Sequence, residues 1–236
     1  MTVTKDKPVQ SAPEAGQQPT QTVSLVEGGE RQPKPPYGHL SVVCGPMFAG
    51  KTTETLKRIL WAKNGRGQSI RVFKPAFDQR HARLQIVSHE GLAADAEAVV
   101  DWDQRSQTMI EESIDVVFFD EVQFFESPNF RGDILQIVED LLAAGIDVVC
   151  SGLDMDWQGK PFPIIAHMAA KADEVHKLRG VCTVCGRPST KTYKKTGSGG
   201  QIEIGGAELY ESRCTIHWAV PDLELTPDLF LSLIHI

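Results

Sequence analysis

The chain has 236 residues and a formal net charge of −7, with no basic stripe, which argues against direct binding to long nucleic acids. No stretch approaches 18 consecutive apolar residues, and the N-terminus is polar where a signal peptide would be hydrophobic, so we expect a cytoplasmic protein without membrane contact. Five cysteines, an odd number, argue against a disulfide framework.

The two ends of the chain differ in composition from the rest. Residues 1–36 hold six of the fourteen prolines, are rich in Gln, Ser and Thr, and show no helical or strand periodicity. We expect a disordered extension there, and its balanced charges favour a plain solubilising role. Residues 221–236 are interpreted as a C-terminal tail. Its last six residues, 231–236, resemble a translated sequencing adaptor and are set aside as a candidate non-native scar.

Residues 37–177 alternate apolar strands with amphipathic helices, which predicts an α/β domain with a parallel sheet and flanking helices. We expect strands at 40–44, 69–74, 97–100, 114–119 and 146–151, and helices at 51–63, 104–112, 130–144 and 163–171. Ligands of such folds gather at the carboxyl ends of the strands. After residue 177 the sequence turns to cysteines and a glycine-rich turn, which predicts a small hairpin-bearing second domain at 178–220.

A phosphate-binding pattern, G-x-x-x-x-G-K-[ST], follows the first strand directly. Its residues, interpreted as ATP-binding, are Gly45, Pro46, Met47, Phe48, Ala49, Gly50, Lys51 and Thr52. We expect Lys51 to contact the outer phosphates and the Thr52 hydroxyl to ligate the Mg²⁺ that accompanies ATP. A chance glycine-rich turn is the alternative, and the strand and helix on either side make it remote. The fold prediction is therefore a P-loop (RecA-like) sheet.

A second acidic motif follows the strand 114–119, where Asp120 and Glu121 stand side by side. After a P-loop, this arrangement predicts that Asp120 binds Mg²⁺ and that Glu121 takes a proton from the attacking nucleophile. We include the next two residues, Val122 and Gln123, in the ATP-binding segment. Without the P-loop, two such carboxylates would more often belong to a solvated loop.

Two chelating pairs lie in the second domain: Cys182-x2-Cys185 and, after 28 intervening residues, Cys214-x2-His217. Three thiolates and one imidazole leave no open coordination position, so they predict a structural Zn²⁺ site. A redox C-x-x-C, with the other two residues unrelated, is the alternative.

Residues 152–162 follow a strand and combine polar groups with two aromatic side chains, Trp157 and Phe162. These rings, and Phe124 beside the predicted base, are suited to enclosing a flat ligand, or they simply pack on the domain surface.

Together these motifs resemble the type II, zinc-containing thymidine kinases in their bacterial form, over residues 38–218. The most specific segments are G-P-M-F-x-G-K-T, D-E-x-Q-F-F, G-L-D-x-D-x-x-G-x-P-F and I-G-G-A-E-L-Y. The resemblance implies transfer of the γ-phosphate of ATP to the 5′-hydroxyl of thymidine, giving dTMP and ADP. It implies that Glu121 is the catalytic base.

The resemblance also implies a set of nucleoside contacts and a lasso-like loop at 191–210 that closes over thymidine. The matching positions are Met47, Asp78, Arg80, Phe124, Leu153, Trp157, Phe162, Thr192, Ile204 and Tyr210. For Asp78 and Arg80 a surface ion pair is a reasonable alternative. The chain departs from the family at Val122, where a small residue is usual, and at Trp157, where Phe is usual.

The family resemblance further implies a homotetramer, a role in nucleoside salvage and feedback inhibition by dTTP. Two other functions stay open on sequence grounds. One is a zinc-containing P-loop ATPase in which Glu121 activates water, and the other is a non-enzymatic zinc module that binds nucleic acid.

Overall fold

The computed structural model describes residues 35–76, 85–88, 91–126, 128–197 and 205–219, all of which lie in the unit Lys34–Ile236. The predicted C-terminal tail and nearly all of the predicted N-terminal extension fall outside the described residues. The domain boundaries expected at residues 36, 177 and 220 therefore remain predictions.

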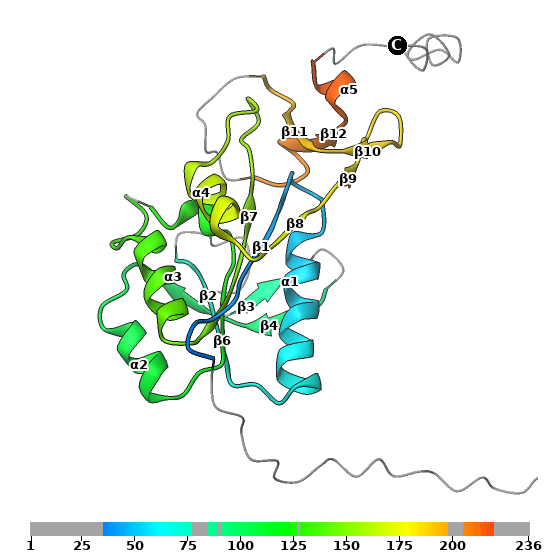
Figure 1. The fold of residues 1–236 in the computed structure, drawn as a ribbon. Coiled ribbons are helices and arrows are strands. Elements are labelled where there is room, and N and C mark those ends of the chain that lie inside the picture. Colours follow the sequence, from blue (N-terminus) through cyan, green and yellow to red (C-terminus); the bar gives the residue numbers. More distant parts are fainter. Residues whose placement is uncertain (1–34, 77–84, 89–90, 127, 198–204, 220–236) are drawn as a thin grey trace, which may run out of the picture. The chain divides into compact units, whose positions relative to one another are not determined.

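The centre of the fold is a six-stranded sheet in which every neighbouring pair is parallel (Figure 1), which confirms the predicted α/β class. The strands, in spatial order, are β5 (Glu97–Val99), β2 (Ile70–Pro75), β6 (Val116–Phe119), β7 (Asp147–Leu153), β1 (Leu40–Gly45) and β8 (Glu174–Lys177). The edge strand β8 was not predicted, because its sequence Glu-Val-His-Lys contains a single apolar residue.

Helices cover both faces of this sheet, with α1 (Lys51–Leu60) on one face and α2 (Arg105–Glu111), α3 (Ile134–Ala143) and α4 (Pro163–Lys171) on the other (Figure 1). The side chains of β1 alternate between two apolar clusters. Val43 packs in the cluster that contains Leu56 of α1, whereas Val42 and Cys44 pack in the larger cluster on the opposite face. Burial on both faces explains why the strands read as continuous apolar runs.

Two helices differ from their predicted bounds. The helix expected at 51–63 ends its α-helical part at Leu60 and continues as a π-helical turn, Trp61–Gly65. The helix expected at 130–144 begins only at Ile134, because the carboxylate of Asp133 caps it by accepting hydrogen bonds from Leu135 N and Gln136 N. A short hairpin, β3 (Gln85–Val87) and β4 (Ala93–Asp95), was not predicted.

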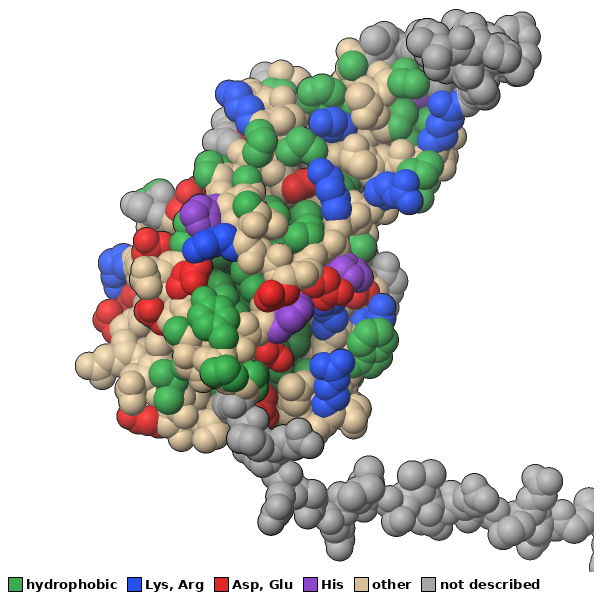
Figure 2. Space-filling view, in the orientation of Figure 1, with side chains coloured by type: hydrophobic (Ala, Val, Ile, Leu, Met, Phe, Trp, Pro, Cys, Tyr) green, Lys and Arg blue, Asp and Glu red, His purple; other side chains and the backbone are tan. Residues whose placement is uncertain are grey.

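The C-terminal part contains two antiparallel strand pairs and one short helix. Strands β9 (Gly180–Val181) and β10 (Pro188–Ser189) pair with each other, and β11 (Lys191–Lys194) pairs with β12 (Tyr210–Arg213) on either side of the glycine-rich turn, as predicted. Helix α5 (Thr215–Ala219) follows. We call residues 178–219 the C-terminal module. Lys and Arg side chains gather over it in the space-filling view (Figure 2).

Candidate active site

Three of the sequence motifs meet at the carboxyl edge of the sheet because β7 lies between β1 and β6. The P-loop follows β1, the two carboxylates follow β6, and the loop 152–162 begins at the end of β7. Parallel strands place these three ends side by side, so the topology builds one site from segments distant in the sequence.

The P-loop turns through three residues with positive φ: Gly45 (148°), Phe48 (62°) and Gly50 (80°). A side chain at Gly45 would place its Cβ 2.6 Å from the carbonyl oxygen of Leu178, so only glycine fits there. Gly50 caps α1, whose first turn presents main-chain N–H groups at the end of the loop. This geometry suits an anion.

Lys51 is buried at the start of α1, and its Nζ donates a hydrogen bond to the carbonyl oxygen of Pro46 at 2.8 Å. Burial lowers the pKa of its ammonium group, while the nearby carboxylates of Glu121 and Asp120 oppose that shift. The lysine and the acidic pair therefore belong to one electrostatic site. Thr52, the predicted Mg²⁺ ligand, is half-buried in the same turn.

Asp120 lies buried at the end of β6, and its main-chain N–H donates to the carbonyl oxygen of Phe73 at 2.9 Å. Burial, followed by the charge of Glu121, raises the pKa of the Asp120 carboxyl to about 7. The buried carboxylate of Asp120 and the partly buried one of Glu121 beside it form a donor set that a divalent cation would stabilise. Asp120 and Thr52 thus fit the predicted magnesium site.

Glu121 adopts a left-handed backbone conformation, with φ 52° and ψ 42°, that residues other than glycine seldom adopt. It precedes a 3₁₀ turn, Val122–Phe124. Strained backbone of this kind often occurs at functional residues.

Gln123 is fully buried and links two of the motifs. Its Nε2 donates to the carboxylate of Glu121 at 2.6 Å, and its Oε1 accepts a hydrogen bond from Leu153 N at 3.0 Å. A Cβ at Gly152 would lie 2.3 Å from that same Oε1, so the glycine makes room for the amide. The side chain of Gln123 thus faces Glu121 and the end of β7, and its place in the ATP-binding segment stays a prediction.

The loop 152–162 is held by its own polar contacts. The carboxylate of Asp156 accepts hydrogen bonds from Gln158 N at 2.8 Å and Lys160 N at 2.9 Å. Trp157, at its tip, is partly exposed, whereas Phe162 is nearly fully buried in the larger apolar cluster. Phe124 is also buried.

The C-terminal module contacts the P-loop directly. Met47 N donates to the hydroxyl oxygen of Thr192, on β11, at 3.0 Å. Tyr210 is buried on β12, where it pairs with Lys194. The structure therefore brings Thr192 to the P-loop. Three other residues expected to bind nucleoside, namely Asp78, Arg80 and Ile204, lie outside the described residues.

The four predicted metal ligands form one cluster: Cys182, Cys185, Cys214 and His217. His217 Nδ1 lies 3.6 Å from the Sγ of Cys182 and 3.3 Å from the Sγ of Cys214, and all four ligand atoms lie within 4.8 Å of one another. A tetrahedral zinc ion with Zn–S bonds of about 2.3 Å separates its ligands by roughly 3.8 Å, so the spacing fits.

The surroundings of one ligand, Cys182, favour its thiolate form, whereas burial raises the pKa of the Cys185 thiol. Burial raises the pKa of the Cys182 thiol, but main-chain groups of Cys214 and Cys185 outweigh it and lower that pKa to about 6. Within the described residues only Cys185 among the four ligands is more than slightly exposed. The closed ligand set indicates a structural metal site rather than a catalytic one.

Comparison with known proteins agrees with this geometry, since a family model described as thymidine kinase matches residues 38–218. The chain belongs to the thymidine kinase family. A thymidine kinase from Thermococcus kodakarensis is 37% identical over 204 residues, which cover 81% of this chain and 99% of that protein. One from Bdellovibrio bacteriovorus is 38% identical over 77% of this chain and 85% of its own. One from Coprothermobacter proteolyticus is 37% identical over 80% and 94%.

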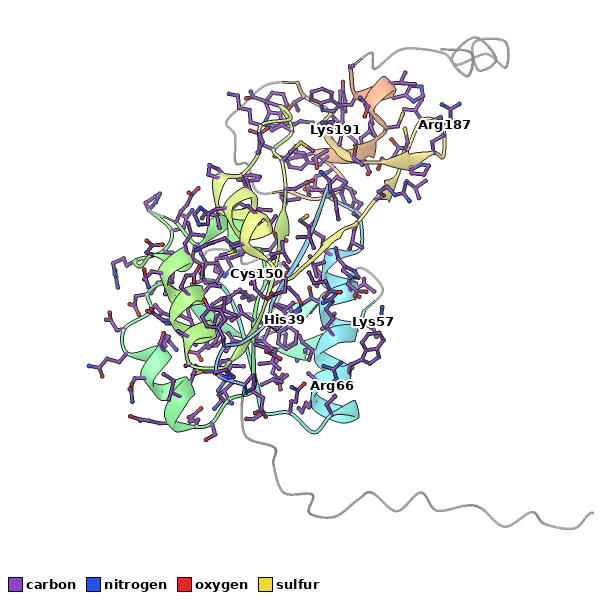
Figure 3. The ribbon with its side chains drawn as sticks, viewed as in Figure 1. His39, Lys57, Arg66, Cys150, Arg187 and Lys191 are labelled. Carbon is purple, nitrogen blue, oxygen red and sulfur yellow. The ribbon has the colours of Figure 1, made fainter. Side chains whose placement is uncertain are left out.

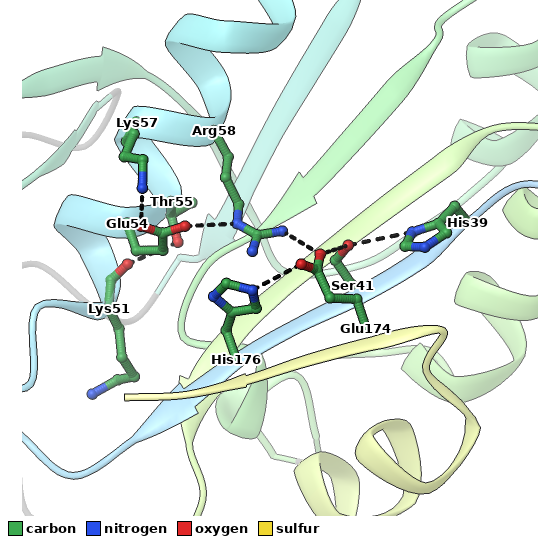
Figure 4. A network of polar contacts seen from close by, with 9 residues as sticks. All are labelled: His39, Ser41, Lys51, Glu54, Thr55, Lys57, Arg58, Glu174 and His176. Carbon is green, nitrogen blue, oxygen red and sulfur yellow. Dashed lines mark hydrogen bonds and ion pairs between the residues drawn. The ribbon is translucent and has the colours of Figure 1, made fainter. Parts of the chain in front are cut away.

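In this member of the thymidine kinase family, a polar network ties the edge strand β8 to α1 (Figure 4). The carboxylate of Glu174 accepts hydrogen bonds from Arg58 at 2.9 Å and Ser41 at 3.0 Å, and Arg58 also contacts Glu54 at 3.0 Å. The hydroxyl of Thr55 donates to the carbonyl oxygen of Lys51 at 3.0 Å. The network therefore steadies the helix that begins at the P-loop lysine.

Two contacts at the site were missed by sequence reasoning. The hydrogen bonds from Gln123 to Glu121 and Leu153 were not predicted, although Gln123 follows Glu121 by only two residues on a tight turn. Asp154, buried just after β7, forms an ion pair with Lys177 at 2.9 Å, which links the ends of β7 and β8 on either side of β1. That pairing had no sequence signal because β8 was not predicted.

Among the helices that the structure describes, none has the length and apolar character needed to span a membrane.

Proposed function

We propose that the protein is a thymidine kinase, which transfers the γ-phosphate of ATP to the 5′-hydroxyl of thymidine and gives dTMP and ADP. The observation that carries the proposal is the position of Glu121. It lies at the carboxyl edge of the sheet, close enough to the P-loop Lys51 to act on its pKa, in a chain of the thymidine kinase family.

Each part of the site has a role in this reaction. Lys51 and the N-terminus of α1 bind the phosphates of ATP, and Thr52 and Asp120 hold the Mg²⁺ that accompanies them. Glu121 accepts the proton of the 5′-hydroxyl as that oxygen attacks the γ-phosphate. Magnesium, when bound, neutralises the phosphate charge that develops during transfer.

The nucleoside is bound on the side of the site formed by the loop 152–162 and the C-terminal module. Trp157, Leu153 and Met47 enclose the base and sugar, together with Phe124, Phe162 and Tyr210. Thr192 already contacts the P-loop and supplies a polar group. Asp78, Arg80 and Ile204 complete the proposed set.

Zinc is the metal that we propose for the cysteine and histidine cluster, because three thiolates and one imidazole at tetrahedral spacing are its preferred donors. The larger assembly and its control are proposed on family grounds: a homotetramer, located in the cytoplasm, inhibited by dTTP and acting in nucleoside salvage.

A panel of nucleosides assayed with ATP and Mg²⁺ tests the proposed function. We expect ADP release that depends on thymidine, and dTMP as the product. ADP released at the full rate without any nucleoside would instead support a P-loop ATPase in which Glu121 activates water, and it would refute the kinase assignment.

A further inference from the structure

Trp218 stands next to the metal ligand His217 and contacts the loop that carries Trp157. Its indole Nε1 donates a hydrogen bond to the main-chain carbonyl oxygen of Trp157 at 3.1 Å. The two residues lie 61 positions apart in the sequence. The contact therefore joins the metal-binding end of the C-terminal module to the tip of the loop 152–162.

The fit between this ring and the loop is close. Gly159, with φ 78°, passes beside Trp218, and a Cβ there would lie 3.1 Å from the edge of the indole ring. Two lysines of β11 add further contacts. Lys191 Nζ lies 5.2 Å from the ring centroid of Trp218, and Lys194 Nζ lies 5.4 Å from that of Trp157. Figure 3 shows Lys191 in the C-terminal module, apart from Lys57 on α1.

The position of Trp218 depends on the metal cluster. Helix α5 has only five residues, too few to be stable alone. His217 Nδ1 faces the sulfurs of Cys182 and Cys214, and Trp218 N donates to the carbonyl oxygen of Cys214 at 2.9 Å. A guanidinium nitrogen of Arg213 donates to the carbonyl oxygen of His217 at 3.0 Å. The ligand cluster thus fixes the indole that the loop contacts.

We infer that Trp218 is a positioning residue for the nucleoside site: it fixes the backbone of Trp157, and so transmits the rigidity of the metal cluster to the wall of the pocket. This inference rests on the proposed function, in which Trp157 encloses the nucleoside. Since the indole of Trp218 contacts Trp157 and Gly159 of the loop 152–162, its effect falls on nucleoside binding. ATP binding and the transfer step stay unchanged.

The test is Trp218→Phe, which keeps an aromatic ring and removes the N–H donor. We expect the KM for thymidine to rise about fivefold, the loss expected for one neutral hydrogen bond, with kcat and the KM for ATP within twofold of wild type. Zinc content should stay at one per chain. Amide hydrogen exchange at residues 154–160 should be faster, a readout that requires no catalysis. Trp61→Phe is the matched control, because Trp61 directly follows α1 and is 57% exposed. It should leave the kinetic constants, the zinc content and the hydrogen exchange unchanged.

An unchanged thymidine KM in Trp218→Phe, or loss of zinc from it, would overturn the inference, because the effect would then be absent or would act through the metal. If Trp218→Phe fails to fold, Gly159→Ala tests the same contact, because it alters the loop instead of the indole. We expect the same rise in the KM for thymidine, with zinc retained. Its control is Gly91→Ala, at φ 85° with no atom within 4 Å of the added Cβ. Equal thymidine KM values in these two variants would also overturn it.

The proposed function is judged separately, on wild type and Trp61→Phe. If neither phosphorylates thymidine, the kinase assignment fails. Hydrogen exchange at residues 154–160 in Trp218→Phe still decides whether Trp218 fixes the loop.

Discussion

The side-chain amide of Gln123 donates to the carboxylate of Glu121 at 2.6 Å while its carbonyl oxygen accepts the N–H of Leu153 at 3.0 Å. One buried side chain therefore holds the proposed base and Leu153, at the start of the loop 152–162, in a fixed relation. The amide supplies both the donor and the acceptor that this link requires. The two strand ends are linked through it.

Replacing Gln123 with Met keeps the length of the side chain and removes both hydrogen bonds. We expect kcat to fall about tenfold because Glu121 loses its orientation. The free energy of unfolding should fall by about 1–3 kcal/mol because Leu153 N–H stays buried without its acceptor. Steady-state kinetics and urea unfolding measure the two effects. Gln136→Met is the control, since the side-chain amide of Gln136 donates an exposed hydrogen bond to Asp140 on α3. Equal kinetics in the two variants would refute the positioning role.

Replacing Glu121 with Gln removes the group proposed to accept the proton. We expect kcat to fall by about 10²- to 10⁴-fold, the usual contribution of a general base, while ATP binding persists. Phosphoryl transfer assays and calorimetric titration with ATP separate these outcomes. Glu126→Gln changes an exposed carboxylate five residues away and should leave turnover unchanged. Near wild-type turnover in Glu121→Gln would exclude it as the base.

Replacing Cys182 with Ser removes one thiolate of the metal cluster. We expect loss of bound zinc and a Tm lower by about 10 °C, because metal binding stabilises the folded module. Elemental analysis and thermal unfolding report both. Cys150→Ala is the control: this thiol is buried in the sheet core, and burial raises its pKa, so zinc should remain bound. If wild-type protein stripped of zinc had the same Tm as zinc-loaded wild-type protein, the prediction would be contradicted.

The parts of the fold that could be predicted were those marked by a pattern of neighbouring residues in the sequence. The P-loop strand is mostly apolar, and the sequence places Gly45 and Gly50 where the backbone needs positive φ, so strand, loop and helix start were all predicted. Edge strand β8 has one exposed face and polar ends, and it is held by its pairing with β1 and by the contact of Glu174 with Arg58, both of which are long-range. Long-range contacts of this kind leave no pattern in the local sequence, so strand β8 could not be predicted.

The same distinction applies to the site. The metal ligands were predicted together because their spacing alone specifies a chelating set, and the structure brings all four together. The link from Gln123 to Leu153 crosses from one strand end to the next, so it depends on β6 lying beside β7. Strand order is a property of the whole chain, and the motif sequences do not encode it separately.

The stability of the β8 edge should depend on pH through Glu174. Hydrogen bonding by Arg58 lowers the pKa of its carboxyl to about 2, from an ordinary 4.5. A carboxyl with a depressed pKa stabilises the fold above its unfolded pKa, and this contribution is lost as pH falls from about 4.5 to 2. Glu174→Gln should therefore cost up to about 1 kcal/mol at pH 6, since the pair is partly exposed, and less at pH 3. Urea unfolding at both pH values measures it. A cost that is the same at both would contradict the assignment.

Gly152→Ala tests whether the Gln123 amide can keep its position only because residue 152 has no side chain. The added Cβ would lie 2.3 Å from Gln123 Oε1 and 2.9 Å from Ile165 Cδ1, so the amide must move and release Glu121. We expect a loss of about 1–3 kcal/mol in the free energy of unfolding, as in overpacked cores, and a kcat as low as that of Gln123→Met. Gly65→Ala, where the Cβ meets nothing within 4 Å, is the control and should be neutral. Because both variants act on one amide, the double variant Gly152→Ala/Gln123→Met should lower kcat little further than either alone; additive losses would show that Gly152 acts elsewhere.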